Sequence, residues 1–215
     1  MNFVYPLGSG SIYSDFELAL SVYLLRKYCD DVNVVVVGSK PRREIKDIVF
    51  IPNENNKSRY VNSMSNLRVG REYFKEPFVL MNDDFFITEK FDKIHLSWDM
   101  KLKDRIISCP SHIYKQTLKN SLMNDDYLNY AVHRPMPVND LDLFDYCIKE
   151  SILRLSSFRV LYGNESTEEG IKIVDVKLKS AIDYVDWFSI SDVFLTKEIN
   201  RRWLSSLTQG TISVN

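Results

Sequence analysis

The chain has 215 residues, of which 45% are hydrophobic, including 12 Phe, 12 Tyr and 3 Trp. This length fits one domain, and the composition can bury a core without disulfides or a structural metal, which excludes disorder over most of the chain. Lys and Arg total 28 against 29 Asp and Glu, so no overall field attracts DNA or an anionic membrane. Any polyanionic partner must therefore bind a local basic patch.

The cysteines and the N-terminal residues indicate the cellular compartment in which the protein is expected. Cys29, Cys109 and Cys147 are widely spaced and form neither a disulfide framework nor a CxxC metal site. The first residues lack a basic region followed by a long apolar one, and no window approaches the roughly 18 apolar residues of a membrane span. We therefore expect a soluble, cytoplasmic protein that does not contact membranes.

The N-terminal pattern predicts a parallel β–α–β unit. Residues 2–5 form an apolar run that we expect to end at Pro6, because proline cannot donate to a strand ladder. Asp15 is placed to cap a helix that ends near Tyr28. The β-branched run at 32–38 then predicts a strand covered on both faces.

A second set of strands leads to the strongest feature of the sequence. Residues 47–52 predict a strand, and a helix is expected to end near Phe74. Residues 79–81 predict another buried strand, followed directly by the sequence Asn-Asp-Asp at 82–84. Ligands of open α/β sheets bind beyond the carboxyl ends of strands, so chemistry is expected there.

The second half is less regular. Residues 130–138 are expected to be extended, and Asn139 or Asp140 can cap a helix that continues to Leu155. Strand-like runs follow at 158–164, 171–180 and 186–194, and a closing helix is predicted at 197–207. The absence of an internal repeat or linker favours one domain over residues 1–215.

Asp83 and Asp84 form a carboxylate pair after a buried strand. Like charges held together raise one another's proton affinity unless they are solvated, lie apart or share a cation. Mg²⁺ or Mn²⁺ suits such oxygen ligands and can also bind a diphosphate leaving group. The alternative is an ordinary acidic turn, since other pairs occur at Asp30–Asp31 and Asp125–Asp126.

Several segments occur in an order that resembles a known group of enzymes: VYPLGSGSIYSDFELALSVYLL, VVVVGSKP, IPNENNK, FVLMNDDFFI, AVHRPMPV, RVLYGN, DVKLKS and WFSISD. The chain resembles small bacterial and phage proteins similar to the Stealth capsular polysaccharide phosphotransferases and, more distantly, to GT-A nucleotide-sugar transferases. The resemblance covers most of the chain, and NDD, SDFEL and HRP are its specific parts. It implies an α/β fold, a single GT-A-like, Rossmann-related domain with a mainly parallel central sheet flanked by helices. Residues 1–90 would form the nucleotide-sugar-binding half and residues 91–215 the acceptor-side half.

The resemblance implies a metal and donor site. NDD is the counterpart of the DxD motif, so Asp84, helped by Asp83, would hold a divalent metal against the donor diphosphate, with Asn82 beside them on the donor. His133 matches an H-x-P element and would be a further metal ligand or touch the donor phosphate. Arg134 would pair with an oxyanion. The alternative for His133 is a loop histidine whose ring is satisfied by backbone groups.

The loop after the first strand would face the nucleotide through Pro6, Leu7, Gly8 and Ser9. In the family segment usually written NDELRYSLRS, Asp15 and Glu17 are kept here, whereas the two arginine positions are Ala19 and Tyr23. This departure favours plain glycosyl transfer over sugar-phosphate transfer. Without the resemblance, Asp15 fits a helix N-cap and Glu17 a solvated charge in the first helical turn.

Further candidates lie elsewhere in the chain. Arg68 and Arg71 share a helix face from which they could reach phosphates, or they could be solvated surface residues. The resemblance implies Lys177 as a cation for the departing diphosphate and Asp192 as a base or second metal contact. It also implies an acceptor cleft lined by Tyr162 and Asn164.

Basic residues in loops that flank the sheet predict a positive rim that could contact the phosphates of a nucleic acid, or a solvated face. They are Lys40, Arg42, Arg43, Lys46, Lys57 and Arg59.

The leading hypothesis is a metal-dependent glycosyltransferase that moves a sugar from a nucleotide-diphosphate sugar to a hydroxyl. The acceptor would be a glycan or a hydroxymethylated base of phage DNA. One alternative is a Stealth-like sugar-phosphate transferase. Another is a catalytically inactive module that binds a sugar or a nucleic acid.

Overall fold

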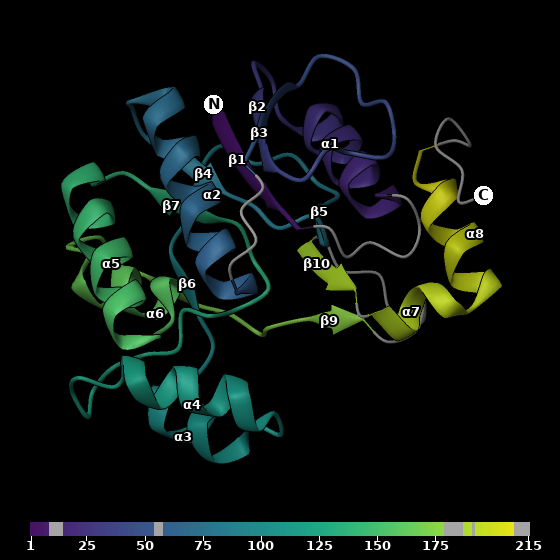
Figure 1. The fold of residues 1–215 in the computed structure, drawn as a ribbon. Helices are drawn as coiled ribbons and strands as arrows, with labels where there is room; N and C mark the ends of the chain where they lie inside the picture. Colours follow the sequence, from purple (N-terminus) through teal and green to yellow (C-terminus); the bar gives the residue numbers. More distant parts are fainter. Residues whose placement is uncertain (9–14, 54–57, 179–186, 191, 209–215) are drawn as a thin grey trace.

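The fold is that of a computed structural model. The structure describes residues 1–8, 15–53, 58–178, 187–190 and 192–208, without the side chains of Asp192 and Val193. Its centre is a sheet in the order β3-β2-β1-β4-β7, with β7 antiparallel to β4 and the other pairs parallel (Figure 1). The strands are β1 (Asn2–Leu7), β2 (Asn33–Gly38), β3 (Val49–Pro52), β4 (Phe78–Leu80) and β7 (Met136–Val138). The predicted mainly parallel α/β fold and its first parallel β–α–β unit are confirmed.

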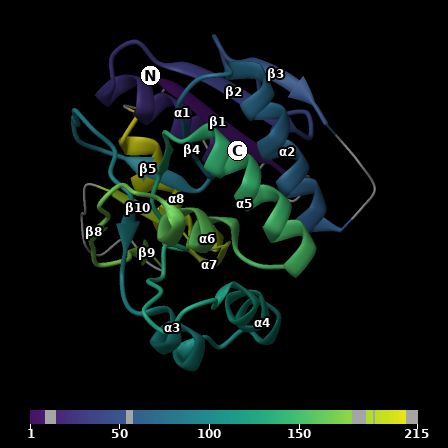
Figure 2. The ribbon, with the colours of Figure 1, turned by 90° about the vertical axis from the view of Figure 1, so that its left-hand side faces the viewer.

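The two faces of this sheet are buried by different elements, because successive strand residues point to opposite faces. Phe3 and Tyr5 pack on one side with α1 and β5, and Val4 packs on the other with α2, α5 and α6 (Figure 2). A Cβ atom at Gly70 of α2 would lie 2.5 Å from Val4 Cγ1, so glycine permits the close approach of this helix to β1. The covering elements are α1 (Phe16–Tyr28), α2 (Arg59–Phe74), β5 (Phe85–Ile87), α5 (Leu141–Arg154) and α6 (Phe158–Glu165).

The first strand continues through Pro6 to Leu7, beyond its predicted end. The carbonyl of Val4 accepts from Met81 on the β4 side, whereas the carbonyl of Leu7 accepts from Ser39 on the β2 side. By alternation Pro6 faces β4, beyond the last ladder pair of that strand, Val4 with Leu80. The missing N–H of proline therefore removes no ladder bond.

A second sheet in the order β5-β10-β9 continues from the β4–β5 turn, with β10 antiparallel to β5 and parallel to β9. Phe86 and Phe188 of this sheet form an apolar cluster with the C-terminal helices. Short strands occur within the segments predicted at 171–180 and 186–194, and the closing helix is confirmed, but residues 192–194 begin a helix. The elements are β6 (Ser97–Trp98), paired with β8 (Ile171–Lys172), then β9 (Lys177–Leu178), β10 (Trp187–Ile190), α7 (Asp192–Thr196) and α8 (Glu198–Ser206).

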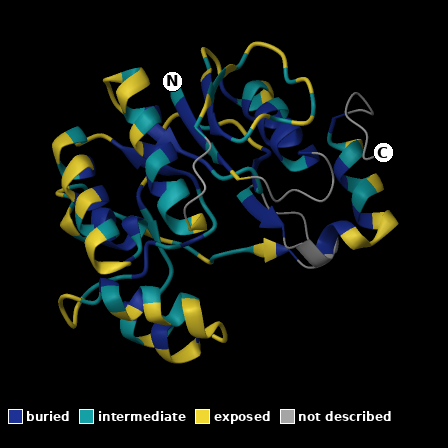
Figure 3. Cartoon of the chain, in the orientation of Figure 1, coloured by how far each residue is buried: buried dark blue, intermediate teal, exposed yellow. Residues whose placement is uncertain are grey.

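Residues 158–164 form α6, not the strand-like run that we predicted. Phe158, Leu161 and Tyr162 recur at helical spacing and pack in the same core cluster as Phe144 of α5. Val160 packs with α3 (Leu102–Ser108) and α4 (His112–Ser121), whose outer surfaces are exposed (Figure 3). In the described part of the chain, no helix is long and apolar enough to cross a membrane.

Candidate functional site

The Asn-Asp-Asp sequence forms a tight turn at the carboxyl end of β4. The amide N–H of Phe85 donates to the carbonyl of Asn82 at 3.2 Å and closes this turn. The turn lies beside the carboxyl end of β1, because β1 and β4 pair in parallel. This is the edge of the sheet at which open α/β folds bind ligands.

Asp83 lies among other carboxylates. Burial raises its pKa to about 7, and the charges of Asp84, Glu17 and Asp15 add to the rise. A cation that bound here would relieve both the desolvation of these groups and their mutual repulsion. The electrostatics of the turn therefore favour a positively charged ligand.

Asp84 faces Lys177 of β9. Its Oδ2 atom lies 3.5 Å from Nζ of the lysine. Burial raises the pKa of Asp84, and the nearby charges of Lys177 and His133 oppose that rise. With 23% of the Asp84 side chain and 39% of the Lys177 side chain exposed, a ligand can reach both groups.

His133 is fixed by Asp175 through two contacts. The backbone N–H of His133 donates to Oδ1 at 2.7 Å, and ring atom Nδ1 lies 2.8 Å from Oδ2. Burial by itself would raise the pKa of Asp175, but the hydrogen bonds and charge of His133 outweigh it and lower that pKa. An ionised Asp175 favours the tautomer with the proton on Nδ1, which leaves the lone pair of Nε2 for a ligand.

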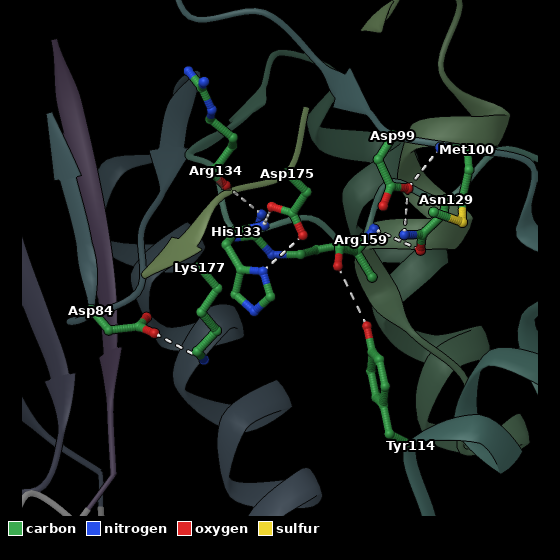
Figure 4. Close-up of polar contacts among 11 residues, drawn as sticks. Asp84, Asp99, Met100, Tyr114, Asn129, His133, Arg134, Arg159, Asp175 and Lys177 are labelled. Carbon is green, nitrogen blue, oxygen red and sulfur yellow. Dashed lines mark hydrogen bonds and ion pairs between the residues drawn. The ribbon is translucent and has the colours of Figure 1, made fainter. Parts of the chain in front are cut away.

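One short segment thus supplies a partner to both Asp84 and His133. Asp175 lies two residues before Lys177, the first residue of β9. Figure 4 shows the His133–Asp175 and Asp84–Lys177 pairs in one region. Asp175 was not among the predicted residues, although a carboxylate and a cation alternating in the strand-like sequence DVK were a usable signal.

Asp15 stands at the N-cap position of α1 but its side chain does not cap the helix. Its Oδ2 accepts the backbone N–H of Arg42 at 2.6 Å, and its φ of 56° places it in the left-handed region. The N-capping expected from the sequence is therefore replaced by a link to the loop after β2. Glu17 is partly buried in the first turn of α1, and its charge raises the pKa of Asp83.

The predicted donor loop lies at the same edge. Pro6 and Leu7 end β1, and Gly8 is exposed with nothing within 4 Å of an added Cβ. Ser9 lies outside the described residues. The described part of this loop is thus adjacent to the 82–84 turn.

Arg68 and Arg71 lie away from this edge. Both occur in the second half of α2, which returns from the carboxyl ends of the strands towards their amino ends. Arg71 contacts Asp145 of α5 at 3.4 Å, and Arg68 is exposed. The β–α–β connection therefore directs both arginines away from the carboxylates, and we leave them out of the proposed site.

Arg134 is directed away from His133 (Figure 4). Its guanidinium lies 5.3 Å from the centre of the Trp187 ring. Its backbone carbonyl accepts a hydrogen bond from Arg159 at 2.7 Å. The pairing of Arg134 with a donor oxyanion stays a prediction.

The polar groups of the two predicted acceptor residues bond to the backbone of the protein. Tyr162 is fully buried, and its hydroxyl accepts the backbone N–H groups of Asn139 and Asp140. The Asn164 amide exchanges hydrogen bonds with the backbone of Leu128. Because these groups are already paired within the fold, we leave Tyr162 and Asn164 out of the acceptor site. The side chain of Asp192 lies outside the described residues.

The basic rim follows the carboxyl end of β2. Lys40 and Arg42 are exposed there, and the guanidinium of Arg43 lies 5.6 Å from the centre of the Phe16 ring. Lys46 is exposed near the amino end of β3, where its carbonyl accepts a hydrogen bond from Arg26 in the last turn of α1. Arg59 is exposed at the start of α2, and Lys57 is not described. Apart from Lys46, the described residues of the rim lie next to the carboxyl edge of the sheet.

Among the described residues, no three His, Cys, Asp or Glu side chains are arranged to hold a metal ion. Asp84 and His133 are instead paired with Lys177 and Asp175. The metal-ligand roles of Asp84 and His133 therefore stay predictions.

No family model and no curated protein matches this sequence. Among 42 matching chains of solved structures is an active-site mutant of LgtC, a GT-A glycosyltransferase. The match covers 100% of this chain and 98% of that chain, with a TM-score of 0.54 and 12% sequence identity. At this identity the likeness concerns the fold, and it shows that this chain has a GT-A-type fold.

Proposed function

We propose that the protein is a glycosyltransferase that moves a sugar from a nucleotide-diphosphate sugar to a hydroxyl group. One observation carries the proposal: a carboxylate pair, a lysine and a carboxylate-anchored histidine meet at the carboxyl edge of a GT-A-type sheet. The residues are Asp83, Asp84, Lys177 and the His133–Asp175 pair. Fold alone does not specify chemistry, so the argument rests on these side chains.

The residues at this edge fit a divalent metal ion. The accumulated charge that raises the pKa of Asp83 would be offset by a cation, and Asp175 holds His133 as carboxylates commonly hold metal-bound histidines. Mg²⁺ and Mn²⁺ sites often use only one or two carboxylates and take further oxygens from substrate phosphates. Asp84 and His133 would hold the ion together with oxygens of the donor phosphates, and the ion would supply charge stabilisation to a diphosphate leaving group.

The side chains of the protein have separable roles in this proposal. Lys177 offers an ammonium group within reach of Asp84 and would stabilise the negative charge of the departing diphosphate. Asp175 holds the His133 ring, and Asp83 and Asn82 would shape the turn beneath the donor. Residues 1–90 provide the carboxylates and residues 91–215 provide His133 and Lys177, so the proposed donor site requires both halves of one domain.

The acceptor hydroxyl would belong to a glycan or to a hydroxymethylated base of phage DNA. The exposed Lys40, Arg42 and Arg59 next to the carboxyl edge support the nucleic acid, because a local basic patch can bind phosphates on a chain of nearly neutral charge.

The test is nucleotide release by the purified full chain. It is incubated with uridine, guanosine and cytidine diphosphate sugars and either a hydroxymethylated DNA or a glycan acceptor, with Mn²⁺ or with EDTA. We expect a nucleoside diphosphate product that requires Mn²⁺ and is lost in Asp84→Asn but not in Asp145→Asn, whose carboxylate contacts Arg71. A nucleoside monophosphate would instead indicate Stealth-like sugar-phosphate transfer, and no product with any donor would contradict the proposal.

A further inference from the structure

Arg159 contacts both segments that carry the proposed ligands. Its guanidinium carbon lies 5.2 Å from the centre of the Phe85 ring, and Nη1 donates to the carbonyl of Arg134 at 2.7 Å. Phe85 directly follows Asp84, and Arg134 directly follows His133. One side chain from α6 thus joins the 82–84 turn to the His133 segment. Figure 4 shows Arg159 with Arg134 and His133.

This is an unfavourable place for a cation. Arg159 is the second residue of α6, where the helix dipole disfavours positive charge. Its Nη2 atom is buried without a hydrogen-bond partner among the described residues, so a charged donor lacks the hydrogen bond that it would make in water. Burial lowers the pKa of the guanidinium to about 10, although Tyr114, Asp84 and Asp175 oppose that effect. A methionine would avoid all three penalties, so packing alone does not account for an arginine here.

We propose that Arg159 is a positioning residue that fixes the separation between the Asp84 carboxylate and the His133 imidazole. Its planar guanidinium can lie on the Phe85 ring and donate in a fixed direction to the Arg134 carbonyl at the same time. Phe85 also meets the His133 ring edge-on, with 6.5 Å between centroids. The effect of this positioning on ligand binding rests on the proposed function, because the separation affects binding only if Asp84 and His133 share a ligand.

The first test is carried out on the full chain without metal. Arg159→Lys keeps the charge but loses the planar fork, so it cannot make both contacts in the same geometry. We expect the backbone amide NMR resonances of residues 82–86 and 132–134 to shift together. The control is Arg154→Lys, which alters an exposed ion pair with Glu150 on α5 and should shift neither segment. Shifts confined to α6, or to one of the two segments, would overturn the proposal.

The second test measures affinity for Mn²⁺ alone, by electron paramagnetic resonance titration of the wild type, Arg159→Lys and Arg159→Met. We expect the dissociation constant to rise at least about tenfold in both variants, as is typical when a group that orients a metal ligand is lost. A purely structural Arg159 would lower the free energy of unfolding and leave the dissociation constant of the folded protein unchanged. That result would overturn the proposal.

The two tests separate this inference from the proposed function. If the wild type binds no Mn²⁺ but both segments shift in Arg159→Lys, the metal part of the proposed function fails and the positioning role stands. If Mn²⁺ affinity falls while neither segment shifts, the positioning role fails and the proposed metal site stands.

Discussion

The centre of the sheet and its carboxyl edge are built on opposite principles. In β1 and β2, Phe3, Val35 and Val36 are fully buried among apolar side chains. At the carboxyl edge, Asp83 is partly buried beside other carboxylates whose charges raise its pKa. The first arrangement stabilises the fold and the second opposes it, as expected where a site is shaped for a ligand of opposite charge.

The largest effect on stability should come from the centre. Phe3→Ala removes a fully buried ring of β1 and should lower the free energy of unfolding by about 3–5 kcal/mol. Urea denaturation followed by circular dichroism measures this loss. A loss below about 1 kcal/mol would show that the β1 centre does not carry the stability assigned to it.

At the carboxyl edge, a substitution should raise the free energy of unfolding of the metal-free protein. The pKa of Asp83 rises on folding from 3.8 to about 7, so the folded state binds the proton more tightly and metal-free stability falls as pH rises between those values. Asp83→Asn should remove this fall and stabilise the metal-free protein at pH 8 by about 2–4 kcal/mol, with little difference below about pH 4.

The pH dependence of urea denaturation in EDTA checks this prediction, with Asp145→Asn as the control. If Asp83→Asn destabilised the protein at pH 8, the carboxylate would be a stabilising group and the proposed contrast would be wrong.

The ionisation of Asp175 should affect stability in the opposite direction to that of Asp83. Its pKa is lowered on folding by the contacts with His133, so its contribution to stability is present above the unfolded pKa and is lost as pH falls. Asp175→Asn should lower the free energy of unfolding by about 1–2 kcal/mol at pH 7 and by less at about pH 3. An effect that does not change with pH would mean that the His133 contact does not depend on ionised Asp175.

The smallest effect should come from the opposite edge of the sheet. Arg71→Met breaks a partly exposed ion pair with Asp145 and should change the free energy of unfolding by less than about 1 kcal/mol. Because Arg71 lies away from the carboxylates, nucleotide release should not change. Reduced nucleotide release by this variant would return Arg71 to the donor site.

The sequence predicted the parts of the fold whose signals are local. The β-branched run of β2 and the apolar strand before Asn82 indicate buried strands whatever their tertiary partners, and they led to the edge where the carboxylates lie. Helix α6 was missed because its apolar residues pack on α5, and that tertiary contact selected a helix for a segment of ambiguous pattern.

The missed site residues depend on contacts distant in sequence. Asp175 meets His133 across 42 residues, and Arg159 meets the Arg134 carbonyl across 25. Arg68 and Arg71 were assigned to the donor site because helix spacing puts them on one face. That spacing does not give their distance from the carboxyl ends of the strands. Tyr162 and Asn164 looked available because their backbone partners lie in other segments.

The central claim is tested most directly by where a donor nucleotide binds. Isothermal titration with uridine, guanosine and cytidine diphosphates, with and without Mn²⁺, is performed on the wild type, Asp84→Asn and Asp145→Asn. We predict that at least one nucleotide binds in the presence of Mn²⁺, that Asp84→Asn weakens this binding by at least about tenfold, and that Asp145→Asn leaves it unchanged. Equal affinity of the wild type and Asp84→Asn, or no binding of any nucleotide, would contradict the account.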